Sequence, residues 1–298
     1  MEIVEMLQTP LMQRALLAAL LVGVVAPVMG TYLVQRKLSL LGDGIGHVAL
    51  TGVALGWLVG AGLGLTQDAL AIPGAVVTAI IGAIGIEVVR ERGRTSGDVA
   101  LALLFYGGIA GGVLIIELAG GQSSNLMTYL FGSISVVTTT DLVLTAVLAL
   151  VVLGLGLGLR TALFAVSQDE EFARASGLPV RFLNIAIAVM SALTVTVAMR
   201  VVGLLLVSAL MIVPVAIAQL VTKSFVWTMR LAIMTGVVIC VVGLSLTYWV
   251  NVSPGAMIVV LAIAVYAVVA VASPLLARRR GHHDPHPDVT SDVILEAP

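Results

Sequence analysis

The sequence has few charged residues. Asp, Glu, Lys and Arg make up 10% of its 298 residues, whereas about 25% is usual in soluble domains. Hydrophobic residues account for 60% of the chain, which leaves too little polar surface to face water on all sides. The net charge of -1 gives no positive excess that would attract nucleic acid. The composition therefore excludes a soluble globular protein and predicts no nucleic-acid partner.

Several catalytic signatures are also absent from the sequence. The single cysteine, Cys240, lies in an apolar run, so neither an intramolecular disulfide nor a thiolate metal cluster is possible. The two lysines, Lys37 and Lys223, follow no glycine-rich phosphate-binding loop, and there is no His-Glu-x-x-His motif. We therefore expect a protein that is not an enzyme and that takes any energy for transport from a partner or an ion gradient.

Long apolar runs dominate the chain instead. About 20 apolar residues are needed to cross a bilayer as a helix. The segments of roughly that length are 15–34, 39–60, 69–89, 98–118, 140–159, 182–199, 201–220, 231–250 and 255–276. Arg200 leaves almost no loop between two of these nine segments, so the count falls to eight if one of them is re-entrant or interfacial. Residues 123–138 resemble a short helix and a turn. The predicted fold class is all-α, a polytopic membrane bundle of eight or nine helices.

The positive residues predict how the chain is oriented. Lys and Arg gather in the connections that follow the odd-numbered segments, and apart from Arg200 the intervening connections contain none. Because cytoplasmic loops hold the excess of positive residues, we expect a cytoplasmic C-terminus and, with nine spans, an external N-terminus. Residues 1–278 are then the membrane domain. Residues 279–298, rich in Pro, Asp and His, are expected to form a disordered cytoplasmic tail.

Glycines recur every four residues in two of the predicted helices. They are Gly52, Gly56 and Gly60 in the second segment and Gly107, Gly108, Gly111 and Gly112 in the fourth. Small residues at this spacing let helix backbones approach closely in lipid. The pattern is equally typical of packing inside one bundle and of an interface between subunits.

One apolar segment carries two polar side chains one helical turn apart. The stretch "LSLLGDGIGHVALTGVALG" contains Asp43 and His47, which a four-residue spacing places on one helix face. Ionisable groups inside a membrane indicate a functional site. A carboxylate oxygen and an imidazole nitrogen together suit borderline divalent ions such as zinc, manganese and iron. The alternative is that Asp43 caps a helix beginning near Gly44 while His47 binds a neighbouring carbonyl.

Other polar or helix-breaking residues give weaker signals. Asp98 opens the fourth segment, where capping a helix is favoured over lining a pathway. Pro214, in "MIVPVAIAQL", predicts a kink that frees a carbonyl, either to line a pathway or for purely structural reasons. Glu87 lies near the end of a segment, where we expect it to pair locally or to reach the membrane interface.

The hydrophilic stretch "SQDEEFARASGLPV" has the signals of a short helix. Asp169, Glu170 and Glu171 occupy its predicted first turn, and Gly177 and Pro179 mark its end. On a membrane protein, a short exposed helix of this kind is either a docking element for a soluble partner or a solvated loop helix.

Six stretches, in order along the chain, resemble the ABC-type zinc/manganese/iron permease family. They are "LSLLGDGIGHVALTGVALG", "TSGDVALALLF", "LMTYLFGSISVV", "DEEFARASGLPV", "VVGLLLVSALMIVPVAIAQL" and "YWVNVSPGAMIVV". The first contains the family's Gly-Asp-x-x-x-His core, and the fourth contains its Asp-Glu-x-x-Ala-x-x-x-Gly-x-Pro loop. The matches run from about Leu11 to Arg278.

This resemblance implies a homodimeric permease in the lipid bilayer of the cell (cytoplasmic or inner) membrane. Its implied partners are ABC ATP-binding subunits on the cytoplasmic face and a solute-binding protein that delivers metal outside. Asp43 and His47 fall at the family's intramembrane metal position, and residues 168–177 at its coupling helix. The coupling residues are then Asp169, Glu170, Glu171, Phe172, Ala173, Arg174, Ala175, Ser176 and Gly177. No permanently bound cofactor is implied, and the transported ion would be zinc or manganese, with iron third.

The sequence thus predicts the membrane subunit of an ATP-driven importer for divalent metal ions, with alternating access around Asp43 and His47. One alternative is a cation-coupled secondary metal transporter that works without an ATPase and uses the same two residues as a proton relay. A membrane receptor or scaffold, and a permease for larger chelates, are further alternatives. A free Asp–His pair inside the membrane argues against the chelate permease.

Overall fold

The computed structural model describes residues 6, 8–66, 69–92, 97–118, 123–133, 138–199, 202–250 and 252–279. Within these ranges, the regular secondary structure is helical, as predicted. The helices are α2 (Pro10–Gln35), α3 (Leu41–Gly62), α4 (Ala71–Glu91), α5 (Gly97–Leu118), α6 (Ser123–Phe131), α7 (Thr139–Gly158), α8 (Arg160–Gln168), α9 (Glu170–Ala175), α10 (Val180–Met199), α11 (Leu204–Val221), α12 (Phe225–Leu246) and α13 (Pro254–Arg279). The predicted tail, beyond residue 279, lies outside the described residues.

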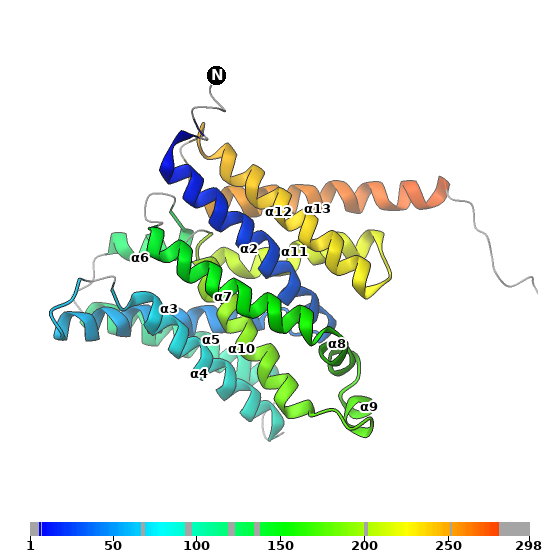
Figure 1. The fold of residues 1–298 in the computed structure, drawn as a ribbon, viewed down its shortest axis with the longest axis horizontal. Helices are drawn as coiled ribbons and strands as arrows, with labels where there is room; N and C mark the ends of the chain where they lie inside the picture. Colours follow the sequence, from blue (N-terminus) through cyan, green and yellow to red (C-terminus); the bar gives the residue numbers. More distant parts are fainter. Residues whose placement is uncertain are drawn as a thin grey trace, which may run out of the picture.

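The long helices run between two ends of one bundle (Figure 1). We call one end the α9 end, because α9 contacts the residue that follows α2 and the last turn of α4 through Arg36 and Arg90. The opposite end is the α6 end. There, Gly203 adopts a φ of 90° and lies against the backbone of Phe131 and Gly132, so a side chain at this position would clash.

Whether eight or nine helices run through the bundle depends on α11. Eight of the described helices are long and apolar enough to cross a membrane, and the apolar part of α11 is shorter. However, α11 begins beside α6 at Gly203, and its second half contacts Val34 near the end of α2. Its 18 residues span about 27 Å. The helix therefore runs from one end of the bundle to the other, beside the eight described helices that are long enough to cross a membrane.

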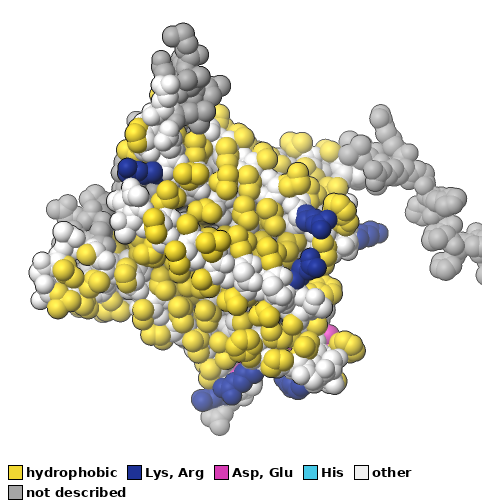
Figure 2. Space-filling model, in the orientation of Figure 1, with side chains coloured by type: hydrophobic (Ala, Val, Ile, Leu, Met, Phe, Trp, Pro, Cys, Tyr) yellow, Lys and Arg dark blue, Asp and Glu magenta, His cyan; other side chains and the backbone are white. Residues whose placement is uncertain are grey.

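The surface of the bundle is apolar, as a lipid-facing surface must be. Figure 2 shows a face covered mainly by hydrophobic side chains, with most of the visible Lys and Arg at its lower and right edges. The helices α2, α3 and α10 are largely buried in the interior, whereas only a small share of α5 and α13 is buried. Cys240 of α12 is fully buried. The chain is a multi-pass membrane protein.

The glycine pattern separates into packed and open faces. Gly56 lies so close to the carbonyl of Leu70 that a Cβ there would overlap it, and Gly52 approaches α4 in the same way. On α5, a Cβ on Gly108 would lie 2.7 Å from the backbone of His47, whereas one on Gly107 would meet no atom within 4 Å. Gly52 and Gly56 of α3 and Gly108 of α5 thus pack inside the bundle, whereas the position of Gly107 stays open.

Candidate functional site

Asp43 is positioned by α3 but does not cap it. The helix begins at Leu41, before Asp43, and the residue that precedes it makes no side-chain capping bond. The alternative in which Asp43 caps a helix beginning near Gly44 is therefore wrong. Instead, the Asp43 carboxylate accepts a hydrogen bond of 3.1 Å from the hydroxyl of Ser208, which lies on α11. The carboxylate thus joins two helices that are far apart in sequence.

His47 lies one turn further along α3 and is 5% exposed. Its Nδ1 is buried and finds no hydrogen-bond partner among the described residues. The ring meets Phe105 of α5 edge-on, with the ring centroids 4.5 Å apart. Most buried polar atoms in proteins are hydrogen-bonded, so an imidazole nitrogen without a partner is a position where a ligand would be stabilising.

Asp43 borders a cavity of about 330 Å³ between α3 and α5. The cavity is lined by Leu40, Asp43, Leu101, Ala102, Phe105 and Tyr106. Tyr106 is 69% exposed, so the cavity opens toward the outer face of α5. A cavity beside a carboxylate gives a hydrated ion room to approach it.

Asp43 and His47 are an incomplete coordination sphere by themselves. In the described part of the chain, no group of three or more His, Cys, Asp or Glu side chains could hold a metal ion. Borderline divalent ions in proteins take four or more ligands. Any ion held at Asp43 and His47 would need further ligands from water, Ser208 or a second polypeptide.

The weaker candidates fall in different places. Asp98 is the second residue of α5, and its side chain lies outside the described residues. Pro214 is buried inside α11, which continues through it. Glu87 pairs locally, as predicted: the Arg90 guanidinium donates to its two carboxylate oxygens at 2.8 and 3.1 Å.

The predicted short helix forms as α9, with clear end signals. Asp169 lies just before the helix rather than in its first turn, and its carboxylate accepts hydrogen bonds from the backbone N–H groups of Glu171 and Phe172, both at 2.9 Å. At the other end, Gly177 adopts a φ of 79°, and the N–H groups of Gly177 and Leu178 close the helix onto earlier carbonyls. A helix of six residues needs such caps because it has few internal bonds.

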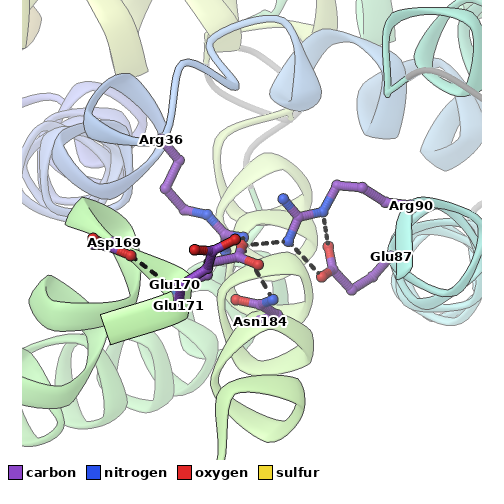
Figure 3. Close-up of polar contacts among 7 residues, drawn as sticks. All are labelled: Arg36, Glu87, Arg90, Asp169, Glu170, Glu171 and Asn184. Atoms are coloured by element: carbon purple, nitrogen blue, oxygen red, sulfur yellow. Dashed lines mark hydrogen bonds and ion pairs between the residues drawn. The ribbon is translucent and has the colours of Figure 1, made fainter. Parts of the chain in front are cut away.

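One carboxylate of α9 gathers polar side chains from three other elements (Figure 3). Glu170 Oε1 accepts hydrogen bonds from Arg36 at 2.6 Å, from Arg90 at 2.7 Å and from Asn184 of α10 at 3.3 Å. With Glu87, these residues form what we call the Glu170 cluster. Burial alone would raise the pKa of Glu170, but the hydrogen bonds and charges of Arg90 and Arg36 outweigh it and hold the pKa below its ordinary value.

The outer side of α9 presents apolar surface. Phe172 is 66% exposed and Phe182, at the start of α10, is 61% exposed. A groove of about 880 Å³ lies between α9, α10 and the end of α4, and Arg174, Arg181 and Phe182 are among its lining residues. Exposed aromatic residues beside a groove are typical of surfaces that bind another protein.

The sequence alone did not reveal the side chains that bind Asp43 and Glu170. Ser208 lies 165 residues from Asp43, and Arg36 lies 134 residues from Glu170. A serine in an apolar run was a possible signal for the first contact. The positive charges of Arg36 and Arg90 predict the topology of the chain, but they do not identify the carboxylate that each guanidinium binds.

Comparison with known proteins gives consistent matches along the chain. The sequence model of the ABC 3 transport family matches residues 8–273. The manganese transport system membrane protein MntC of Halalkalibacterium halodurans is 32% identical over 91% of this chain and 90% of its own length. A probable iron transport system membrane protein of Haemophilus influenzae is 31% identical over 93% of this chain and 98% of its own.

A solved structure also matches this chain over most of its length. PsaBC from Streptococcus pneumoniae, in complex with Fab, superposes with a TM-score of 0.80 and 32% identity, covering 93% of this chain and 99% of the matched chain.

Proposed function

This chain belongs to the ABC 3 transport family, and from that membership we propose that it is the membrane permease of an ATP-driven importer for divalent transition metal ions. The relatives named above are a manganese and an iron transport protein. Manganese and iron are therefore the first substrates to test, and zinc remains a candidate because an oxygen and an imidazole ligand suit it equally.

The observation that carries the proposal is the pairing of Asp43 with His47. Asp43 borders a cavity, and the Nδ1 of His47 has no partner among the described residues. In a membrane, a carboxylate with one neutral hydrogen bond is costly, and a divalent cation would offset that cost by binding both side chains. Ser208 would orient the carboxylate, as outer residues do at metal sites. The metal is the cargo, not a resident cofactor.

A second copy of the chain would complete the site. The cavity beside Asp43 is lined by α5, whose outer face exposes Leu103 and Tyr106, each at 69%, and leaves Gly107 open. Lipid cannot cover a surface onto which a carboxylate opens without cost. A homodimer through the outer face of α5 would cover the cavity, place two Asp–His pairs near one axis and supply the missing ligands.

The proposed coupling element is α9. Its exposed Phe172 and the adjacent groove would receive an ABC ATP-binding subunit at the α9 end, which is then cytoplasmic. Lys37 and Arg92 lie in the short connections at that end, and Arg181 lies at the start of α10, as the positive-inside rule requires. A solute-binding protein would deliver the metal at the α6 end. ATP hydrolysis would take place in the partner subunit, since this chain has no phosphate-binding loop.

Reconstitution tests the proposal. The permease, its ATP-binding subunit and its solute-binding protein would be placed in proteoliposomes, and uptake of manganese, iron and zinc would be measured with and without ATP. We expect uptake only when ATP and the ATP-binding subunit are both present. Metal flux through the permease alone, without ATP, would instead support the cation-coupled secondary transporter.

A further inference from the structure

The Glu170 cluster connects α9 to the beginning of the helix that carries Asp43 and His47. Arg36, the residue after α2, binds Glu170 through a 2.6 Å ion pair, and its own side chain is only 4% exposed. Five residues after Arg36, α3 begins at Leu41, and Asp43 lies in its first turn. The path from α9 to the candidate metal site therefore passes through one ion pair and one tight turn.

That turn is held in a defined conformation. Lys37 adopts a φ of 58°, which is uncommon for a residue other than glycine. The Leu38 N–H donates to the carbonyl of Leu33 at 2.9 Å, and the Leu41 N–H donates to the carbonyl of Leu38 at 3.0 Å. A turn closed by hydrogen bonds on both sides moves with the side chain that anchors it, so a shift of Arg36 would displace the start of α3.

Arg36 cannot easily separate from α9. Glu170 is the hydrogen-bond acceptor that the described residues provide for its guanidinium. If α9 moved away by itself, Arg36 would remain buried without its bonded counter-charge, which is strongly unfavourable. A displacement of α9 is therefore expected to carry Arg36 with it.

The second arm of the cluster leads to α4. Arg90 binds Glu170 and Glu87 together, so the end of α4 follows α9 as well. Arg90, Glu87 and Leu101 line a small cavity of about 140 Å³ near Leu40, and Leu40 and Leu101 also line the cavity beside Asp43. Movement of α9 would thus reach Leu40 and Leu101, the two residues that line both cavities.

We propose that Glu170 is a positioning residue that transmits the displacement of α9 to the start of α3, and thereby links ATP hydrolysis in the partner to access at Asp43. This inference rests on the proposed function. It assigns this role to the carboxylate of α9 that binds both Arg36 and Arg90.

The test compares Glu170→Gln with Ser245→Ala in the complete reconstituted transporter. The number of metal ions taken up per ATP hydrolysed would be measured for equal amounts of assembled complex. We expect Glu170→Gln to assemble and to hydrolyse ATP while the transport ratio falls about tenfold or more. Ser245→Ala, which changes a side chain of α12 outside α9 and outside the Glu170 cluster, should keep the wild-type ratio.

A structural role alone would give a different result. If the cluster only stabilised the fold, Glu170→Gln would lower the amount of assembled complex without changing the ratio per complex, and the inference would be overturned. Glu170→Asp, which keeps the charge but shortens the side chain, should give an intermediate ratio. Failure of both variants to assemble would also overturn the inference in favour of a folding role.

A double variant tests the ion pair directly. Because Arg36 and Glu170 act as one unit in this account, Arg36→Gln combined with Glu170→Gln should lower the ratio no further than either single change. If the double variant instead lowered the ratio by the product of the two single effects, the proposed link between Arg36 and Glu170 would be contradicted. Wild-type complex without ATP-dependent uptake would overturn the proposed function as well, whereas active wild type with a normal Glu170→Gln ratio would overturn this inference alone.

Discussion

The two polar regions of this bundle differ in how fully their hydrogen-bonding groups are satisfied. Around Glu170, two guanidinium groups, two carboxylates and an amide meet at distances between 2.6 and 3.3 Å, although the amide oxygen of Asn184 has no partner in the described chain. Around Asp43, a single hydroxyl donates, and the Nδ1 of His47 has no partner in the described chain. A network in which most of the polar groups are hydrogen-bonded fixes helices relative to one another. An unsatisfied pair beside a cavity is a site that binds something else.

The largest expected effect tests the unsatisfied pair. Asp43→Asn keeps the shape of the side chain but removes the charge that would attract a dication, so metal uptake should fall by a factor of about 100 or more, to background. Uptake in proteoliposomes measures this, with membrane expression and association with the ATP-binding subunit as controls. Wild-type uptake by this variant would show that the Asp43 carboxylate is not part of the metal pathway.

The next prediction separates packing inside the chain from packing between chains. Gly56→Leu forces a side chain against the backbone of α4 and should destabilise the fold by about 1–3 kcal/mol or more. Gly107→Leu adds a side chain where nothing lies within 4 Å, so the monomer should stay folded while the dimer is lost.

Thermal unfolding and size-exclusion chromatography in detergent give the two readouts. A Gly107→Leu variant that remains dimeric would place the subunit interface elsewhere.

A smaller effect is expected at the hydroxyl that supports Asp43. Ser208→Ala removes the 3.1 Å hydrogen bond and should weaken apparent metal affinity by about tenfold, the lower range for residues that orient metal ligands. Ser245→Ala is the matched control, because that hydroxyl donates to Val241 of its own helix. Concentration dependence of uptake measures both. Equal affinities for the two variants would mean that Ser208 does not orient the carboxylate.

The smallest expected effect concerns the pH dependence of the Glu170 cluster. The pKa of Glu170 is below its ordinary value of 4.5 in the folded protein, so its ion pairs stabilise the fold above about pH 4.5. That contribution is lost as the pH falls through the lowered pKa. Because Glu170 is one-third exposed, the effect should be about 1 kcal/mol or less.

Unfolding in detergent from pH 7 to pH 3 measures this contribution. The stability gap between wild type and Glu170→Gln should close in acid, and a gap that persists at pH 3 would contradict the assignment.

Local patterns were sufficient to predict most of the fold. Apolar runs predict the long helices because length and hydropathy in a bilayer leave few other structures. The turn signals around Asp169 and Gly177 predicted α9 because caps act over a few residues. The same spacing rules placed Asp43 and His47 on one face of α3.

What the sequence did not reveal depends on contacts between distant segments. No local pattern pairs Ser208 with Asp43, or Glu170 with Arg36, since each pairing follows from how α3, α9 and α11 pack. The count of eight or nine passes was open for the same reason. An arginine beside two short apolar segments predicts a break, and only packing against α6 and α2 shows that α11 crosses the whole bundle.

The burial of Cys240 has a practical consequence. It is the chain's one thiol, and it is 0% exposed within α12. Maleimide dyes and nitroxide labels in the aqueous phase therefore meet no native target. A cysteine introduced at Phe172 or Tyr106 would carry such a label on an otherwise silent background, so spectroscopic distances between two copies could be followed through a turnover without first removing any residue.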